Sequence, residues 1–163
     1  MKALTISQPF ASLIASGEKW IENRCWRTYY RGPLAIHAGL GRQCLDRAKL
    51  AAYPTSRIVA VCDLVTCLSW GEIQAEAQRN PDGMPNGIKR AWVIDPCVND
   101  PRPEVIPSGR GRTWREIRDH EHCEGEWCWI FANVRRVESE TIRGAQGLWD
   151  LPAEFAATLK ASA

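Results

Sequence analysis

Short apolar segments are the feature that most constrains the fold of this chain. Even the longer ones, such as residues 58–62, are far shorter than the roughly 20 apolar residues that a bilayer-spanning helix needs. Polar and turn-forming residues separate these segments, which suits buried strands and one-sided helices. The 163 residues, 45% hydrophobic and 25% charged, predict a single domain over 1–163. The pattern excludes a membrane-spanning protein and argues against wholesale disorder.

The order of the predicted elements indicates an α+β domain. Strands and helices of unequal length follow one another irregularly, which favours a curved or closed sheet over a regular βαβ repeat. We predict extended segments at 3–6, 19–26, 34–38, 57–68, 90–95, 126–137 and 147–151, and helices at 8–17, 42–52, 70–79, 114–120 and from Pro152 onward. Six prolines between residues 80 and 112 predict loops around the strand at 90–95.

Cysteine usage indicates a reducing compartment. The seven cysteines are an odd number, and the first residues do not resemble a secretion signal. A chain of this length can also build a core without disulfides. We therefore expect a cytoplasmic protein with no membrane association.

Charge is distributed unevenly, although the net charge is only +2. Residues 1–60 carry nine Lys or Arg against three Asp or Glu, and the remaining residues carry twelve against sixteen. Sixteen of the 21 basic residues are arginine, which favours bidentate contacts with phosphate or carboxylate. A basic N-terminal part fits an anionic partner such as nucleic acid, and a solvated charged face explains the same pattern.

The densest group of charged residues lies between residues 17 and 24. Lys19, Glu22 and Arg24 fall at a predicted helix-to-strand junction, where such charges are costly unless they pair or meet a ligand. Alternation along an extended chain puts Glu22 and Arg24 on one face, where they either pair or bracket a bound group. A lysine in such surroundings can also serve as a base. The sequence is consistent both with a structural ion pair among these residues and with a catalytic pair.

Two tryptophans flank this charged segment. The same alternation places Trp20 and Trp26 on the face of Glu22 and Arg24, where a nucleic-acid base could stack on each at about 1–3 kcal/mol. Packing against the sheet is the alternative. Cys25 falls on the opposite face, so we expect it to be a small core residue.

The three histidines have structural alternatives to ligand binding. His37 ends a predicted core strand, where a hydrogen-bonded structural role competes with ligand contact. His120, His122, Cys123 and Cys128 are ligand types that suit zinc, but their spacing matches no standard finger. We predict no metal site and no cofactor.

One group of motifs resembles a known family. The resemblance is carried by Gly17-x-Lys19-x-x-Glu22-x-Arg24, which is similar to the signature of the ASCH family, and by blocks at 4–14, 30–38, 127–129 and 144–149. It spans about residues 3–151, with an insertion near 97–122 that matches poorly. The resemblance implies a PUA-like mixed β-barrel with flanking helices, and a cleft lined by residues 17–24 for RNA or a nucleotide-like ligand.

The resemblance also implies alternatives for the chemistry. Some family members are described as ribonucleases, and a smaller group hydrolyses the amide of N4-acetylcytidine. In that group a lysine matching Lys19 acts with a threonine and a glutamate. This chain has Glu22 in place of the threonine, and Asp63 is the only nearby carboxylate on the central strand.

The residues and the resemblance together give a hypothesis for the site. We expect single-stranded RNA, or a nucleoside or nucleotide, to bind in a basic cleft. RNA hydrolysis, a non-catalytic binding module and an amidohydrolase all stay open. The expected catalytic residues are Lys19, Glu22 and Tyr30, and the expected ligand-binding residues are Ser7, Gln8, Ser12, Arg24, Trp26, Arg31 and His37.

Overall fold

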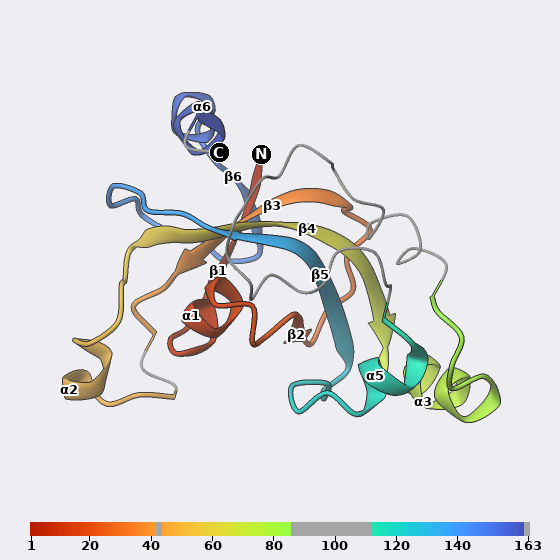
Figure 1. Cartoon of the computed structure of the whole chain (residues 1–163). Coiled ribbons are helices and arrows are strands. Elements are labelled where there is room, and N and C mark those ends of the chain that lie inside the picture. The colour runs from red at the N-terminus through yellow and green to blue at the C-terminus, as the bar shows by residue number, and fades with distance from the viewer. Residues whose placement is uncertain (42–43, 86–111, 162–163) are drawn as a thin grey trace. The chain divides into compact units, whose positions relative to one another are not determined.

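Two long strands, β4 (Arg57–Ser69) and β5 (Trp127–Arg136), contribute to both parts of the fold (Figure 1). The structure is a computed structural model that describes residues 1–41, 44–85 and 112–161. The chain divides into two compact units. The first unit comprises Met1–Lys19, Pro33–Cys62 and Val134–Ala163, and the second comprises Trp20–Gly32 and Asp63–Asn133.

The first unit is built on the strand order β4-β3-β1-β6. β1 (Lys2–Ile6) runs parallel to β3 (Gly32–Ala38) on one side and antiparallel to β6 (Leu148–Asp150) on the other. Its helices are α1 (Phe10–Ala15), α2 (Arg47–Leu50) and α6 (Ala153–Ala161).

The core of the first unit combines small residues on the sheet with apolar residues of α6. Ala3 and Ala35 are direct partners in the pairing of β1 with β3, and both are fully buried. Small side chains at this point let other apolar groups approach the sheet closely. Ala156 and Leu159, three residues apart on one face of α6, belong to the same cluster.

The second unit has the strand order β2-β5-β4, and two helices lie in its described residues. β2 (Ile21–Arg24) runs antiparallel to β5, and the helices are α3 (Trp70–Arg79) and α5 (Trp114–Arg118). Each helix begins with a capping box, in which a hydroxyl and a glutamate satisfy backbone N–H groups reciprocally. These pairs are Ser69 with Glu72 and Thr113 with Glu116.

Apolar faces of both helices pack in the core of the second unit. The helices contribute buried residues at helical spacing, such as Ile73 and Ala77 of α3. Among the described residues, the buried members of this cluster are Trp20, Ile21, Ile73, Ala77, Trp114, Ile117, Cys123, Cys128, Ile130 and Ala132.

The observed elements confirm the predicted α+β class, with a mixed sheet and flanking helices. The helix predicted at 42–52 is wrong in length, because α2 covers only Arg47–Leu50 and begins after Asp46, whose carboxylate accepts the N–H of Lys49. The strand predicted at 90–95 and the part of the 97–122 insertion before residue 112 lie outside the described residues. The expectation of one domain over 1–163 stays a prediction.

Candidate functional site

The predicted site residues are divided between the two units. Ser7, Gln8, Ser12, Lys19 and His37 belong to the first unit, and Glu22, Arg24, Trp26, Tyr30 and Arg31 belong to the second. A single cleft formed by all of them stays a prediction.

Gln8 joins two segments of the first unit through its buried amide. Its Nε2 donates to the carbonyl of Pro54 at 2.7 Å, and its Oε1 accepts the backbone N–H of Ser12 at 3.0 Å. The side chain is 0% exposed, and a buried amide of this kind needs such partners. Gln8 therefore fixes α1 against the turn at residues 53–54, while Ser7 accepts the N–H of Ala11 through its carbonyl.

Lys19 lies where the chain leaves α1. Gly17 has a φ of +83°, which reverses the chain after the helix, and the N–H of Lys19 donates to the carbonyl of Leu13 at 2.9 Å. Only 2% of Lys19 is exposed, and its ammonium lies 5.4 Å from the centre of the Phe10 ring. This cation–π contact holds an enclosed amine at the end of the first helix.

Glu22 and Arg24 lie on one face of β2, as the alternation predicts. The Nη2 of Arg24 is 3.3 Å from Oε1 of Glu22, which forms the ion pair considered above. In the register with β5, Glu22 stands opposite Trp129 and Arg24 opposite Trp127. Glu22 is buried and therefore offsets part of the charge of Arg24 in poorly solvated surroundings.

Residues 24–31, which we name the arginine–aromatic segment, contain three arginines, three aromatic residues and no acidic residue. The segment is held against β5 by Trp26, whose ring meets that of Trp129 edge to face with centres 4.6 Å apart. The indole N–H of Trp129 donates to the carbonyl of Trp26 at 3.3 Å. This packing fixes the segment on the aromatic face of β5.

Arg27 and Tyr29 form the most accessible part of the arginine–aromatic segment. The guanidinium of Arg27 lies 4.8 Å from the centre of the Tyr29 ring and 5.2 Å from that of Trp127. Tyr29 is 79% exposed. Neither Arg27 nor Tyr29 is among the residues predicted from the sequence, although the interleaving of arginine and aromatic residues is a signal that identifies them.

A tight turn completes the segment. Buried Thr28 accepts the N–H of Tyr30 on its hydroxyl at 3.1 Å. The Nη1 of Arg31 donates to the carbonyls of Thr28 and Tyr30 at 3.0 and 2.7 Å. These bonds fix the backbone of residues 28–31, which follow Arg27 directly in the chain.

Two residues beside β2 differ from expectation. Trp20 is buried in the core and meets the ring of His120 edge to face, with centres 4.4 Å apart. The alternation does not extend back to Trp20 because β2 begins only at Ile21. Cys25 is exposed because β2 ends at Arg24, so the expected core position is wrong.

His37 is enclosed in the first unit. Its Nε2 donates to the carbonyl of Ile142 at 3.0 Å, and within the described residues its buried Nδ1 has no hydrogen-bond partner. Gly144 lies so close that a Cβ at this position would collide with the ring and with Thr5. Burial lowers the pKa of His37, and the bond to Ile142 opposes that effect. This geometry favours the structural alternative.

The possible zinc ligands do not form a metal site. The sulfurs of Cys123 and Cys128 lie 3.8 Å apart in the core, and the rings of His120 and His122 are centred 5.6 Å apart. Across the parts of the chain that the structure describes, no group of three or more His, Cys, Asp or Glu is arranged to hold a metal ion.

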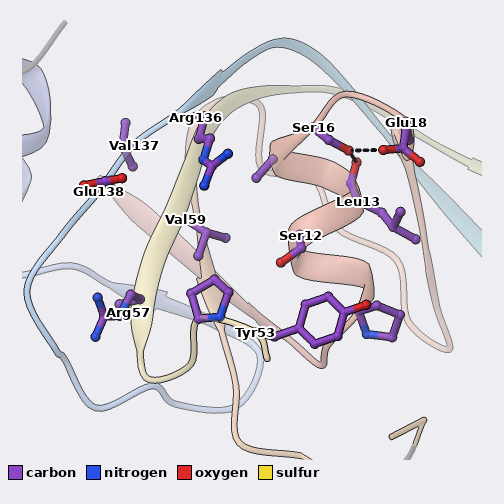
Figure 2. A pocket seen from close by; sticks show the side chains of 13 residues that line it. Ser12, Leu13, Ser16, Glu18, Tyr53, Arg57, Val59, Arg136, Val137 and Glu138 are labelled. Carbon is purple, nitrogen blue, oxygen red and sulfur yellow. Dashed lines mark hydrogen bonds between the residues drawn. The ribbon is translucent and has the colours of Figure 1, made fainter. Parts of the chain in front are cut away.

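A pocket of about 480 Å³ lies within the first unit (Figure 2). Ser12 is the one predicted site residue in its lining, and Figure 2 shows it on α1, facing the segments that carry Val59 and Arg136. Arg57, Arg136 and Tyr53 also line the pocket, and the sequence reasoning missed them because they come from separate segments.

Comparison with models of protein families identifies the family to which this chain belongs. A model of the ASCH domain matches residues 4–141. The chain belongs to the ASCH family. This confirms the resemblance identified from the Gly17–Arg24 motif and its flanking blocks.

A solved structure of an ASCH protein shares the fold. The ASCH protein from Zymomonas mobilis is similar at 12% identity with a TM-score of 0.51, over 98% of this chain and 93% of that chain. A point variant of that protein has a TM-score of 0.49 at 14% identity, over 98% and 96% of the respective chains. Identities this low show the fold alone. A comparison with curated proteins gave no significant match. In the described part of this ASCH chain, no helix is long and apolar enough to cross a membrane.

Replacing Gln8 by alanine should lower the free energy of unfolding of this ASCH protein. The substitution Gln8→Ala leaves the N–H of Ser12 and the carbonyl of Pro54 without their buried partner, a loss of about 1–3 kcal/mol. Urea denaturation measures the change, and Gln146→Ala, at an exposed glutamine of the same unit, is the matched control. Equal stability of the two variants would contradict the role of Gln8.

The enclosed His37 should make stability depend on pH. Because its pKa is lower in the folded than in the unfolded chain, the stabilisation is complete above the unfolded value of about 6.5 and is lost as the pH falls from there. Urea denaturation between about pH 7.5 and pH 5 should therefore show a steeper loss for the natural protein than for His37→Gln. If the free energies of unfolding of the two proteins change in parallel with pH, His37 contributes nothing to the pH dependence of stability.

Proposed function

We propose that this ASCH domain binds single-stranded RNA through the arginine–aromatic segment. The observation that carries the proposal is the position of Arg27, which lies against the rings of Tyr29 and Trp127 while Tyr29 stays largely exposed. Proteins that bind single strands combine cations for the phosphates with rings on which bases stack. The segment offers both within eight residues.

Charge pairing within the second unit supports this assignment. Glu22 accompanies Arg24, whereas Arg27 and Arg31 form no ion pair with any residue that the structure describes. The ring contacts of Arg27 orient its guanidinium without cancelling its charge. Arg27 and Arg31 are therefore the cations of the segment best suited to phosphate groups, with Trp26 and Tyr30 as further aromatic residues beside them.

The RNA-binding proposal predicts a large effect of a double change at the exposed pair. Arg27→Gln combined with Tyr29→Ala should raise the Kd for a short labelled single-stranded RNA at least about fivefold, because a stacked ring contributes about 1–3 kcal/mol. Losing one phosphate contact should also reduce the magnitude of the slope of log K against log salt concentration by about 0.7. Fluorescence anisotropy at several salt concentrations measures both effects.

A matched control separates this effect from a general loss of positive charge. Arg143→Gln removes an exposed arginine of the first unit and should leave the Kd close to that of the natural protein. If Arg143→Gln weakens RNA binding as much as the double variant does, the segment is not the binding surface.

RNA hydrolysis is a second candidate function, and the enclosure of Lys19 favours it. An amine with 2% exposure acts in surroundings that contain little water, where its interactions with a reacting phosphate are strengthened. In this hypothesis Lys19 activates the 2′-hydroxyl or stabilises the transition state. Glu22 takes a proton or orients Lys19, Tyr30 assists, and Arg24 holds the phosphate. These roles stay predictions.

Turnover assays with Lys19 variants test this second candidate. The natural protein and Lys19→Ala are incubated with labelled single-stranded RNA and, in parallel, with N4-acetylcytidine, each with and without EDTA. If Lys19 is catalytic, Lys19→Ala loses turnover while its RNA affinity and its melting temperature are retained. Parallel loss of turnover and affinity would make Lys19 a binding residue.

The same assays separate the remaining classes. Cleavage of RNA indicates a ribonuclease, and release of acetate from N4-acetylcytidine indicates an amidohydrolase. If the natural protein binds RNA but turns over neither substrate, the domain is a binding module without chemistry. Lys19→Arg, which keeps the cation, shows whether charge alone suffices.

A further inference from the structure

Two buried thiols of the second unit lie in direct contact. The sulfurs of Cys123 and Cys128 are 3.8 Å apart, and either thiol can donate to the other. Cys123 is 6% exposed and Cys128 is fully buried, and both belong to the core cluster of this unit. Neither residue has a part in the RNA-binding or catalytic proposals, so any function of the pair is independent of those proposals.

The turn between α5 and β5 brings these sulfurs together. The N–H of Cys123 donates to the carbonyl of His120 at 2.8 Å, and Gly125, with a φ of +80°, lets the chain turn back toward β5. Cys128 then lies in β5, directly opposite Asn23 of β2. A bond between the two sulfurs would therefore enclose only this short turn and the first residues of β5.

The amide of Asn23 anchors the same turn from β2. Its Nδ2 donates to the carbonyl of His122 at 2.8 Å, and its Oδ1 accepts the N–H of Glu124 at 3.2 Å. The thiol of Cys128 makes longer contacts, 3.7 Å to this Oδ1 and 3.5 Å to the carbonyl of Glu124. The two amide bonds do not involve sulfur, so the turn stays anchored if Cys128 loses its proton.

A disulfide at this point requires only a local movement. Sulfurs joined in a disulfide are about 2.05 Å apart, so those of Cys123 and Cys128 must approach by roughly 1.8 Å. Rotation about the Cα–Cβ bond of Cys123 can supply part of that movement. Exposed residues 124–126 follow Cys123 directly, so the backbone on its side can adjust more readily than the paired backbone of β5.

A metal ion is a less suitable partner for the two thiols. Structural zinc sites use four protein ligands. Within the described ranges, no further His, Cys, Asp or Glu is placed with Cys123 and Cys128 so that the group could hold a metal ion. Two thiols in contact, with no third metal ligand among the described residues, are better suited to a bond between their sulfurs.

We propose that Cys123 and Cys128 are a reversible oxidation site that forms an intramolecular disulfide with a hydroperoxide as oxidant. The deprotonated sulfur of Cys123, the more accessible of the two, attacks one oxygen of hydrogen peroxide, and the O–O bond breaks. Cys123 becomes a sulfenic acid, and the other oxygen leaves as hydroxide and takes up a proton to give water. The sulfur of Cys128 then attacks the sulfenic sulfur, and the S–O bond breaks to release a second water with the proton of Cys128. Two thiols are oxidised while one peroxide is reduced to two waters.

Peptide mapping of the full chain tests the proposal. The protein is treated with hydrogen peroxide at a concentration that oxidises the exposed thiols of Cys25 and Cys44, and is then unfolded, alkylated and digested with trypsin. Residues 119–135 form one tryptic peptide that contains Cys123 and Cys128 and no other cysteine. We expect this peptide to carry no alkyl group and to be two hydrogen atoms lighter than the reduced peptide, and dithiothreitol should restore both alkylation sites. Two alkylated cysteines after peroxide treatment, or a sulfinic acid on Cys123 beside a thiol on Cys128, would overturn the proposal.

Serine variants identify the sulfur that reacts first. In Cys128→Ser, Cys123 should stop at the sulfenic acid, which dimedone traps. In Cys123→Ser, Cys128 should stay reduced because it is fully buried. Cys25→Ser removes an exposed thiol and is the matched control, which should form the disulfide as the natural protein does. If Cys25→Ser abolishes the disulfide, the exposed thiol reacts first and the assignment to Cys123 is wrong.

Thermal unfolding shows whether the bond fits the native fold. The oxidised natural protein should melt at a temperature at least as high as that of the reduced protein, because a disulfide restricts the unfolded chain. Cys123→Ser, treated in the same way, corrects for oxidation of the exposed thiols. A lower melting temperature in the oxidised natural protein, but not in oxidised Cys123→Ser, would show that the bond forms only in unfolded molecules and would contradict the proposal. Peptide mapping of the natural protein decides the proposal even if a variant at one of these core positions does not fold.

Discussion

The pairing of β2 with β5 is the constraint on which the proposed RNA-binding surface depends. β2 has only four residues, yet its register puts Ile21 opposite Ile130 in the core and Arg24 opposite Trp127 on the other face. A slip of one residue would exchange these faces and bury the charges in the apolar cluster. Burial of Ile21 therefore determines where Arg24 lies, and where the arginine–aromatic segment begins.

A buried amide has the corresponding role in the first unit. Gln8 is surrounded by protein, so leaving either end of its amide unpaired would cost more than each bond gains in isolation. That asymmetry makes one arrangement of α1 and the turn at Pro54 strongly preferred over all others. The pocket beside them is thus maintained by the hydrogen-bonding demand of a residue that does not itself line it.

Most of the fold, but only part of the candidate site, could be predicted from the sequence. Local periodicity located β4 and α3 closely, because hydrophobic patterning is a property of residues that are close together in the chain. The length of α2 was wrong because tertiary surroundings decide how far a weak helix extends. Alternation put Glu22 and Arg24 on one face and left their pairing as one of two alternatives, which the ion pair at 3.3 Å decides. Arg57 and Arg136 line one pocket although they come from separate strands, and no local pattern reveals that.

The surroundings of each arginine, and not the net charge of +2, decide where an anion can bind. Arg24 has Glu22 at 3.3 Å, so its charge already has a partner within the protein. Arg27 lies against two rings that orient it without neutralising it, and Arg136 stands at the edge of a partly apolar pocket. A charge count weighs these three residues equally. The excess of basic residues before position 60 therefore indicates an anionic partner, but only the contacts of individual guanidinium groups distinguish the arginines that stabilise the fold from those available to a phosphate.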